Sequence, residues 1–447
     1  MLAGERASLS ALDKFSRLAA LKPARAAMPL AEPFGEPMQG DEITHLLGGL
    51  CQKTKFGEHL TIRNWYSTPE FAEPAAAVLD LLARNKDEAV SRRTRTALEN
   101  PEKWLFLDTE TTGLAGGTGT YAFLTGIGWW DSGGLQVEQF FMRDFADEHS
   151  VLCELAERIA ERPVLVTFNG KTFDWPLLES RFTMTRRIAA PKLAAHLDLL
   201  HPARALWRLR LGSVRLVELE REVLDARRLG WHRKDDVASA LIPQFYFDYL
   251  RGGSAAPLAG VVRHNQLDLR GLAALFGKIN SVLAEQELEE ADGRDLFGLS
   301  RFLYRRGEAP RAAKMCSKAI EAGLPAEHRQ QASRELALMA KRRGDHAEAA
   351  QLWQTLLTGS QHGIEACEQL AIHFERREKN LAQAMEYAQL GLTKLYAGGQ
   401  RLRDPYAEAR IARQEKNLLR RVARLKLRLS NEKPQPGQMT AAAGRLL

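Results

Sequence analysis

Two acidic residues, Asp108 and Glu110, end a short apolar segment in the sequence WLFLDTETTGL. Side chains two residues apart on a strand project from one face, about 7 Å apart, so these carboxylates would lie side by side. At the end of a buried strand they would repel each other and lose hydration, which raises the pKa of at least one. A bound divalent cation removes this conflict, and hard oxygen ligands favour Mg²⁺ or Mn²⁺. A solvated strand end is the alternative, because D-x-E alone is a weak motif.

Two later segments carry acids that could join this pair. Asp174 follows the polar loop in VLVTFNGKTFDWPLL, at the start of an expected helix, where helix N-capping is the ordinary alternative. In VVRHNQLDLRGL, His264 and Asp268 are four residues apart, so a helix would place both on one face. A surface pair, or a hydrogen bond on one face of that helix, is the alternative. Each alternative is plausible singly, but the ordered combination of the three segments is improbable by chance.

The elements that must position these residues alternate between strands and helices. Strands are expected in WLFLD, AFLTGIGWW, LQVEQFFM, PVLVTF and AAHLDLL, and helices over residues 148–160, 175–182 and 258–283. The turn DSGG joins two consecutive strands, which indicates a mixed sheet rather than a purely parallel one. We therefore expect an α/β fold with a mixed sheet flanked by helices. Residues 1–95 are weakly patterned, with one or two short strands at 54–66 and a helix at 75–98.

A phrase recurs in the region after residue 295, where strand signals are absent. RRGEAPRAA begins at Arg305, RRGDHAEAA at Arg342 and the looser RREKNLAQAM at Arg376. Each phrase places a turn before a helix that opens with small residues, and spacings of 37 and 34 residues are typical of helical repeat arrays. The region resembles about three tetratricopeptide repeats (TPRs), although the aromatic and proline positions of that consensus are poorly kept. An ordinary helical bundle is the alternative.

The final helix is expected to cap this array, because one side is an apolar stripe and the other is basic. The stripe consists of Ile411, Leu418, Val422, Leu425 and Leu429. From Arg401 to Leu447 there are 12 Lys and Arg against 4 Asp and Glu, and residues 181–234 hold 13 against 5. Such concentrated basic segments favour a polyanionic partner, most often nucleic acid. A solvated helix face with a basic tail explains them equally well.

The composition of the 447-residue chain excludes several classes of protein. Hydrophobic residues make up 45 % and charged residues 27 %, which is typical of globular domains with real cores. Four widely spaced cysteines exclude a disulfide scaffold and a cysteine zinc site. No apolar run approaches the roughly 20 residues of a membrane span, and the charged N-terminus does not resemble a secretory signal. A cytoplasmic protein without membrane contact is expected.

The acidic segments together resemble the DEDD 3′–5′ exonucleases of the ribonuclease H-like superfamily, over residues 103–279. DTETTGL supplies Asp108 and Glu110, NGKTFDWPLL supplies Asp174, and HNQLD supplies Asp268. The phrases GLAGGTGTYAFLTGIGWW and HRKDDVASALIPQFYFDYL are similar to the YprB-type branch, whose members often carry helical repeats behind the nuclease domain. We therefore expect a ribonuclease H-like domain at 96–285 after the 1–95 region, TPR-like repeats at 290–396, and a basic helix and tail at 397–447.

The resemblance implies a metal-dependent 3′–5′ exonuclease that acts on single-stranded DNA or RNA. Two Mg²⁺ or Mn²⁺ ions would be held about 3.5–4 Å apart by four acids: Asp108, Glu110, Asp174 and Asp268. His264 would accept the proton of the attacking water. The candidate substrate contacts are Thr109, Asn169, Lys171 and Thr172, although a loop needs polar residues in any case.

The third motif departs from the family pattern. Histidine-type enzymes have four residues between His and Asp, whereas tyrosine-type enzymes have three between Tyr and Asp. Here three residues separate His264 from Asp268. Among other polar residues, Asp198 is expected to cap a helix. His232 and Asp236 in HRKDD could approach the site, but a solvated loop is the favoured expectation. The alternative function is a nucleic-acid-binding or TPR scaffold protein with a weak or inactive site, whose repeats bind a protein partner.

Overall fold

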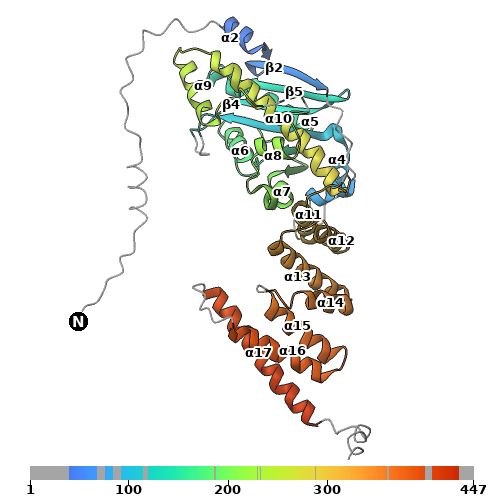
Figure 1. Ribbon diagram of the computed structural model, residues 1–447. Helices are drawn as coiled ribbons and strands as arrows, with labels where there is room; N and C mark the ends of the chain where they lie inside the picture. The colour runs from blue at the N-terminus through green and yellow to red at the C-terminus, as the bar shows by residue number, and fades with distance from the viewer. Residues whose placement is uncertain are drawn as a thin grey trace, which may run out of the picture.

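The structure is a computed structural model that describes residues 40–67, 76–83, 92–113, 119–185, 188–228, 230–231, 233–286, 288–359, 362–397 and 405–431. A seven-stranded mixed sheet flanked by helices is followed by an all-helical region, which extends away from one end of the sheet (Figure 1). The expected fold class is therefore confirmed.

The strands pair in the order β1-β2-β5-β4-β3-β6-β7. Their bounds are β1 (Leu50–Thr54), β2 (Gly57–Ser67), β3 (Trp104–Thr111), β4 (Ala122–Asp131), β5 (Gly134–Phe141), β6 (Val164–Thr167) and β7 (Ala195–Asp198). Neighbours from β1 to β3 along this order are antiparallel, whereas β3, β6 and β7 are parallel. The hairpin expected at DSGG joins β4 to β5 through Ser132 and Gly133, which both have positive φ. Strands β1 and β2 extend the sheet beyond the 96–285 range expected for the domain.

Helices surround this sheet. Their bounds are α2 (Gly40–Leu47), α3 (Ala76–Ala83), α4 (Arg92–Leu98), α5 (Glu148–Glu161), α6 (Asp174–Met184), α7 (Leu200–Leu211), α8 (Leu216–Glu222), α9 (Ile242–Leu250) and α10 (Ala256–Leu283), with short 3₁₀ turns η1 (Pro101–Lys103), η2 (Phe145–Asp147) and η3 (Ser239–Leu241). One helix is expected at 75–98, and the described residues of that range include two helices, α3 and α4. The long helix α10 runs across the sheet and contacts β3, β4 and β5 (Figure 1).

The central strand β3 is buried on both faces, which explains its continuous apolar run. Trp104 and Phe106 pack edge-on against Phe276 of α10. Leu105 and Leu107 point to the opposite face and share a core with α5 and α6. The alternation continues into the acids, so residues 108 and 110 follow the face that α10 covers.

The C-terminal region consists of consecutive helices. Their bounds are α11 (Gly293–Arg305), α12 (Ala309–Glu321), α13 (Ala326–Arg343), α14 (His346–Thr355), α15 (Gly363–Arg376), α16 (Leu381–Ala397) and α17 (Pro405–Asn431). The alanines of the recurring phrase, Ala312, Ala349 and Ala384, are all buried. Leu418 and Leu425 of α17 are fully buried in one cluster with α15 and α16, so the last helix does cover the end of the array.

The helical region is packed directly against the sheet domain. Helix α11 contacts α7, and a side chain at Gly298 would overlap the carbonyl oxygens of Ala205 and Leu206. Apolar residues of α11, α12 and α13 belong to the same core cluster as one face of the sheet. In the described part of the chain, no helix is long and apolar enough to cross a membrane.

Candidate active site

The acids Asp108 and Glu110 lie in the C-terminal half of β3, after the apolar run of that strand has ended. Both are partly buried, and both approach side chains of α10. The pairing of β3 with β4 shifts register between Glu110 and Thr111, so the regular ladder ends beside the acids. The site therefore lies at the carboxyl end of the central strand.

Asp108 is held by an amide network that crosses the sheet. The Nδ2 atom of Asn265 on α10 donates to Asp108 Oδ2 at 2.7 Å. Gln139 Nε2 donates to Asn265 Oδ1 at 2.8 Å, which fixes the orientation of that amide. Gly126 lies directly opposite Asp108 on β4, and any side chain there would overlap Asn265 Oδ1. The glycine thus makes the room that this contact requires.

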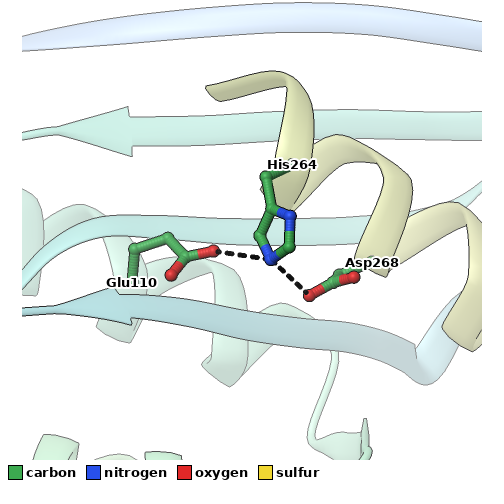
Figure 2. A group of neighbouring side chains, drawn as sticks. All are labelled: Glu110, His264 and Asp268. Atoms are coloured by element: carbon green, nitrogen blue, oxygen red, sulfur yellow. Dashed lines mark ion pairs between the residues drawn. The ribbon is translucent and has the colours of Figure 1, made fainter. Parts of the chain in front are cut away.

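His264 and Asp268 lie on one face of α10, as their spacing predicts. His264 Nε2 is 3.6 Å from Asp268 Oδ2 and 4.0 Å from Glu110 Oε1 (Figure 2). One ligand atom from each of these three residues lies within 4.8 Å of the others, which is a spacing that suits a metal ion. The other ring nitrogen, Nδ1, is 2.8 Å from Asp236 Oδ1.

Asp174 is the first residue of α6 and reaches β3 from the side of Thr109. The Thr109 hydroxyl donates to Asp174 Oδ1 at 2.6 Å. The N-cap of α6 is Phe173, which makes no capping hydrogen bond through its side chain, so the capping alternative for Asp174 is not what the structure contains. Instead, the Asp174 carboxylate is directed to the strand that carries Asp108 and Glu110.

The carboxylates form one electrostatically coupled group. Burial raises the pKa of Asp108 well above its usual range, and the charges of Asp268, Glu110 and Asp174 raise it further. Burial also raises the pKa of Glu110, to about 8, although His264 opposes the shift. Burial also raises the pKa of Asp174, although the hydrogen bond from Thr109 opposes this shift. Burial and mutual repulsion therefore oppose full ionisation of these carboxylates.

The segment HRKDD approaches the site, which the sequence left open for Asp236, and it adds Arg233, which no sequence pattern had indicated. Asp236 was expected in a solvated loop, but its carboxylate is nearly buried and contacts His264. Arg233 donates to Asp236 at 2.9 Å and also to Glu220 and Asp268. His232 lies outside the described residues. The solvated-loop interpretation is wrong for Asp236 because a loop far from α10 in sequence folds back against that helix.

The loop between β6 and α6 is fixed through its backbone. Asp198 accepts hydrogen bonds from the backbone N–H groups of Asn169 at 2.8 Å, Lys171 at 3.1 Å and Leu200 at 3.1 Å. Leu199 is the N-cap residue of α7, so Asp198 is not the expected helix cap itself, but it accepts from the first backbone N–H group of that helix and also fixes the loop. Lys171 and Thr172 are exposed in this loop, three and two residues before Asp174 in the sequence. Most of the glycine-rich segment GLAGGTGT lies outside the described residues.

Two comparisons with known proteins bear on this arrangement. Residues 105–280 match the ribonuclease H superfamily, a span that contains all five candidate catalytic residues. The chain is also 30 % identical over 298 residues to the uncharacterized protein YprB of Bacillus subtilis (strain 168). This similarity covers 66 % of the present chain and 70 % of YprB.

Proposed function

The chain belongs to the YprB family and carries a ribonuclease H-superfamily domain, and we propose that it is a metal-dependent 3′–5′ exonuclease. Its substrate would be single-stranded DNA or RNA, and the product a nucleoside 5′-monophosphate. The observation that carries this proposal is the approach of acids from β3 and α10 to one histidine, with Asp174 of α6 hydrogen-bonded to the same strand β3. A buried cluster of this kind has no packing rationale, because each unpaired carboxylate opposes folding.

The donor set suits hard divalent cations such as Mg²⁺ or Mn²⁺. We assign two ions to the four acids Asp108, Glu110, Asp174 and Asp268. When bound, the ions would lower the pKa of a water molecule and stabilise negative charge on the scissile phosphate and the leaving oxygen. The raised pKa values of Asp108, Glu110 and Asp174 support this assignment, because burial, with a smaller contribution from neighbouring acids, disfavours their charged forms and added positive charge would offset both effects.

His264 is proposed to accept a proton from the attacking water. Asp236 occupies its Nδ1 atom, so Nε2 is the nitrogen directed toward Glu110 and Asp268. Burial opposes charge on the ring, but the Asp236 hydrogen bond and the nearby carboxylates of Asp268 and Glu110 raise the pKa of His264 overall. The ring is therefore well suited to hold the proton that it takes up.

The substrate would approach along the loop that precedes α6. Asn169, Lys171 and Thr172 are proposed to contact its phosphates, since Lys171 and Thr172 are exposed in the loop that precedes Asp174. The Thr109 hydroxyl donates a hydrogen bond to Asp174, so we propose that Thr109 acts by positioning that acid. The helical region at 290–396 is proposed as a TPR-like platform for a protein partner. A cytoplasmic location is part of this proposal.

A comparison of linear and circular single strands tests the exonuclease assignment. With Mn²⁺, linear strands should lose nucleoside 5′-monophosphates, whereas a circular strand and a linear strand with a 3′-terminal phosphorothioate block should resist. Cleavage of the circle at the linear rate would contradict exonuclease action. Chelation with EDTA should stop hydrolysis of every substrate.

A further inference from the structure

We propose that Arg233 is a positioning residue of the candidate active site. Its guanidinium holds Asp268, an assigned metal ligand, and Asp236, the partner of His264, in one hydrogen-bonded unit. The inference rests on the proposed nuclease function. Arg233 lies in the loop between α8 and α9, and its side chain is only 7 % exposed. Its guanidinium contacts Asp268, an acid of the assigned metal site.

The guanidinium joins three carboxylates. Its Nε and Nη2 atoms donate side-on to Glu220 at 2.6 and 2.7 Å. Its Nη1 atom donates to Asp236 Oδ2 at 2.9 Å, and Nη2 also donates to Asp268 Oδ1. A planar fork of donors can satisfy this geometry, whereas the point charge of a lysine cannot.

These contacts determine which oxygen each shared carboxylate presents to the site. Asp236 gives Oδ2 to Arg233, which leaves Oδ1 to accept from His264 Nδ1. Asp268 gives Oδ1 to Arg233, which leaves Oδ2 on the side of His264 Nε2. The guanidinium therefore sets both the ring orientation of the histidine and the rotation of a proposed ligand.

The arginine is itself anchored by a buried acid. Glu220 is 2 % exposed and reaches α10 at Gly271, where any side chain would overlap its carboxylate. Glycine inside a helix is less favourable than alanine, so the close approach of Glu220 has a cost in helix stability. The anchor, the arginine and the two acids form one continuous network from α8 to the metal site.

An ion pair with a purely structural role would also hold this loop against α10. The test must therefore separate an effect on the position of Asp236 and Asp268 from an effect on folding. Arg233→Lys keeps the charge and removes the fork. Glu220→Gln and Gly271→Ala disturb the anchor without altering any assigned ligand. Arg228→Lys, at an exposed position of the same loop, is the matched control. Circular dichroism checks the fold, calorimetry measures Mn²⁺ affinity, and initial rates on a single-stranded oligonucleotide give kcat and KM.

Loss of outer-sphere support typically weakens a metal site by 10- to 100-fold, so Arg233→Lys should weaken Mn²⁺ binding and lower kcat by about that factor. KM for the oligonucleotide should stay within about twofold, because uniform substrate binding is untouched. Glu220→Gln and Gly271→Ala should shift both values in the same direction, and Arg228→Lys should match wild type. These two anchor variants decide the matter if Arg233→Lys does not fold.

Wild-type Mn²⁺ affinity and kcat in folded Arg233→Lys, or in both anchor variants, would overturn the inference while leaving the proposed nuclease intact. A wild-type protein that binds no Mn²⁺ and cleaves no strand would instead overturn the proposed function, and this inference with it. The metal titration separates the two failures because it needs no turnover.

Discussion

Asp236 and His264, 28 residues apart in sequence, form the contact that orients the candidate site's histidine, with Asp236 Oδ1 at 2.8 Å from His264 Nδ1. A carboxylate at this position keeps the proton on Nδ1 in the neutral ring. The lone pair on Nε2 then points toward the acids of β3 and α10. This tautomer is the one that a general base at this position requires.

Replacing His264 should lower turnover without removing the metal site. His264→Ala is expected to cost about 10²–10⁴ in kcat, the usual contribution of a general base. His264→Tyr should keep part of the activity, since its three-residue spacing from Asp268 matches tyrosine-type enzymes. Wild-type rates should rise with pH as the ring loses its proton, and both variants should lose this limb. If the limb persists in His264→Ala, another group accepts the proton.

Gly126→Ala should disable the site from the neighbouring strand. The new methyl group would displace Asn265, which supports Asp108. We expect kcat to fall by about 10- to 100-fold, as for other losses of ligand support. Gly128→Ala is the control, because a side chain there meets its neighbours at 3.5 Å or more. Equal rates in the two variants would contradict the role assigned to Asn265.

The metal-free protein should become less stable as the pH rises toward 9. The pKa of Glu110 is raised from 4.5 to about 8 in the folded state, so the folded protein holds a proton that the unfolded chain has lost. The stability that this proton provides is present below about pH 4.5 and is lost as the pH passes 8. Thermal melts in EDTA should show Tm falling between about pH 5 and 8, the interval between the unfolded and folded pKa values of Glu110.

Added Mg²⁺ should reduce this fall in Tm, because the cation replaces the proton as the partner of Glu110. Glu110→Gln removes one of the groups with a raised pKa and should make the metal-free profile shallower, with Asp108 and Asp174 still contributing. A wild-type profile in EDTA that matches the profile of Glu110→Gln would show that Glu110 ionises normally.

Basic residues of α17 should divide into structural and nucleic-acid-binding groups. Glu375 on α15 is nearly buried and pairs with three arginines of α17, namely Arg421, Arg424 and Arg428. Arg413, Lys416 and Arg420 are exposed on the same helix. Neutralising these three with glutamine should reduce the salt slope for single-stranded binding by about 2, at about 0.7 per phosphate contact.

Point variants test this better than truncation, because removing α17 would uncover the core that contains Leu418 and Leu425. The matched control neutralises three cations at the sheet domain, Lys53, Lys55 and Lys103. An unchanged slope in the α17 variant would assign the helix a capping role alone.

Regular periodicity explains which parts of the site could be predicted from the sequence. The period of two along β3 places Asp108 and Glu110 on one face, and the period of 3.6 along α10 does the same for His264 and Asp268. Both segments are long enough, or buried enough, for their patterns to be unambiguous. The helices and strands that carry the expected motifs are therefore found close to the expected residues.

The supporting contacts depend on tertiary approach, which no local pattern reports. Arg233 and Asp236 belong to an irregular loop, and nothing in their spacing links them to α10. The significance of Gly126 and Gly271 lies in the side chains of Asn265 and Glu220 that pack against them. Strands β1 and β2 were also harder to assign to the sheet, because β1 is an edge strand with largely exposed side chains.

The most direct test of the central claim is a digestion of 5′-labelled single-stranded DNA and RNA in Mn²⁺, with wild type beside Asp108→Asn. We predict that wild type produces a ladder shortening from the 3′ end of at least one of the two strands. Asp108→Asn should keep the wild-type fold by circular dichroism and lose more than about 10²-fold in rate. Losing a metal ligand should lower the rate more than losing a residue that only supports a ligand, which typically costs about 10- to 100-fold. A ladder of equal strength from Asp108→Asn, or no ladder from wild type on either strand, would contradict the account.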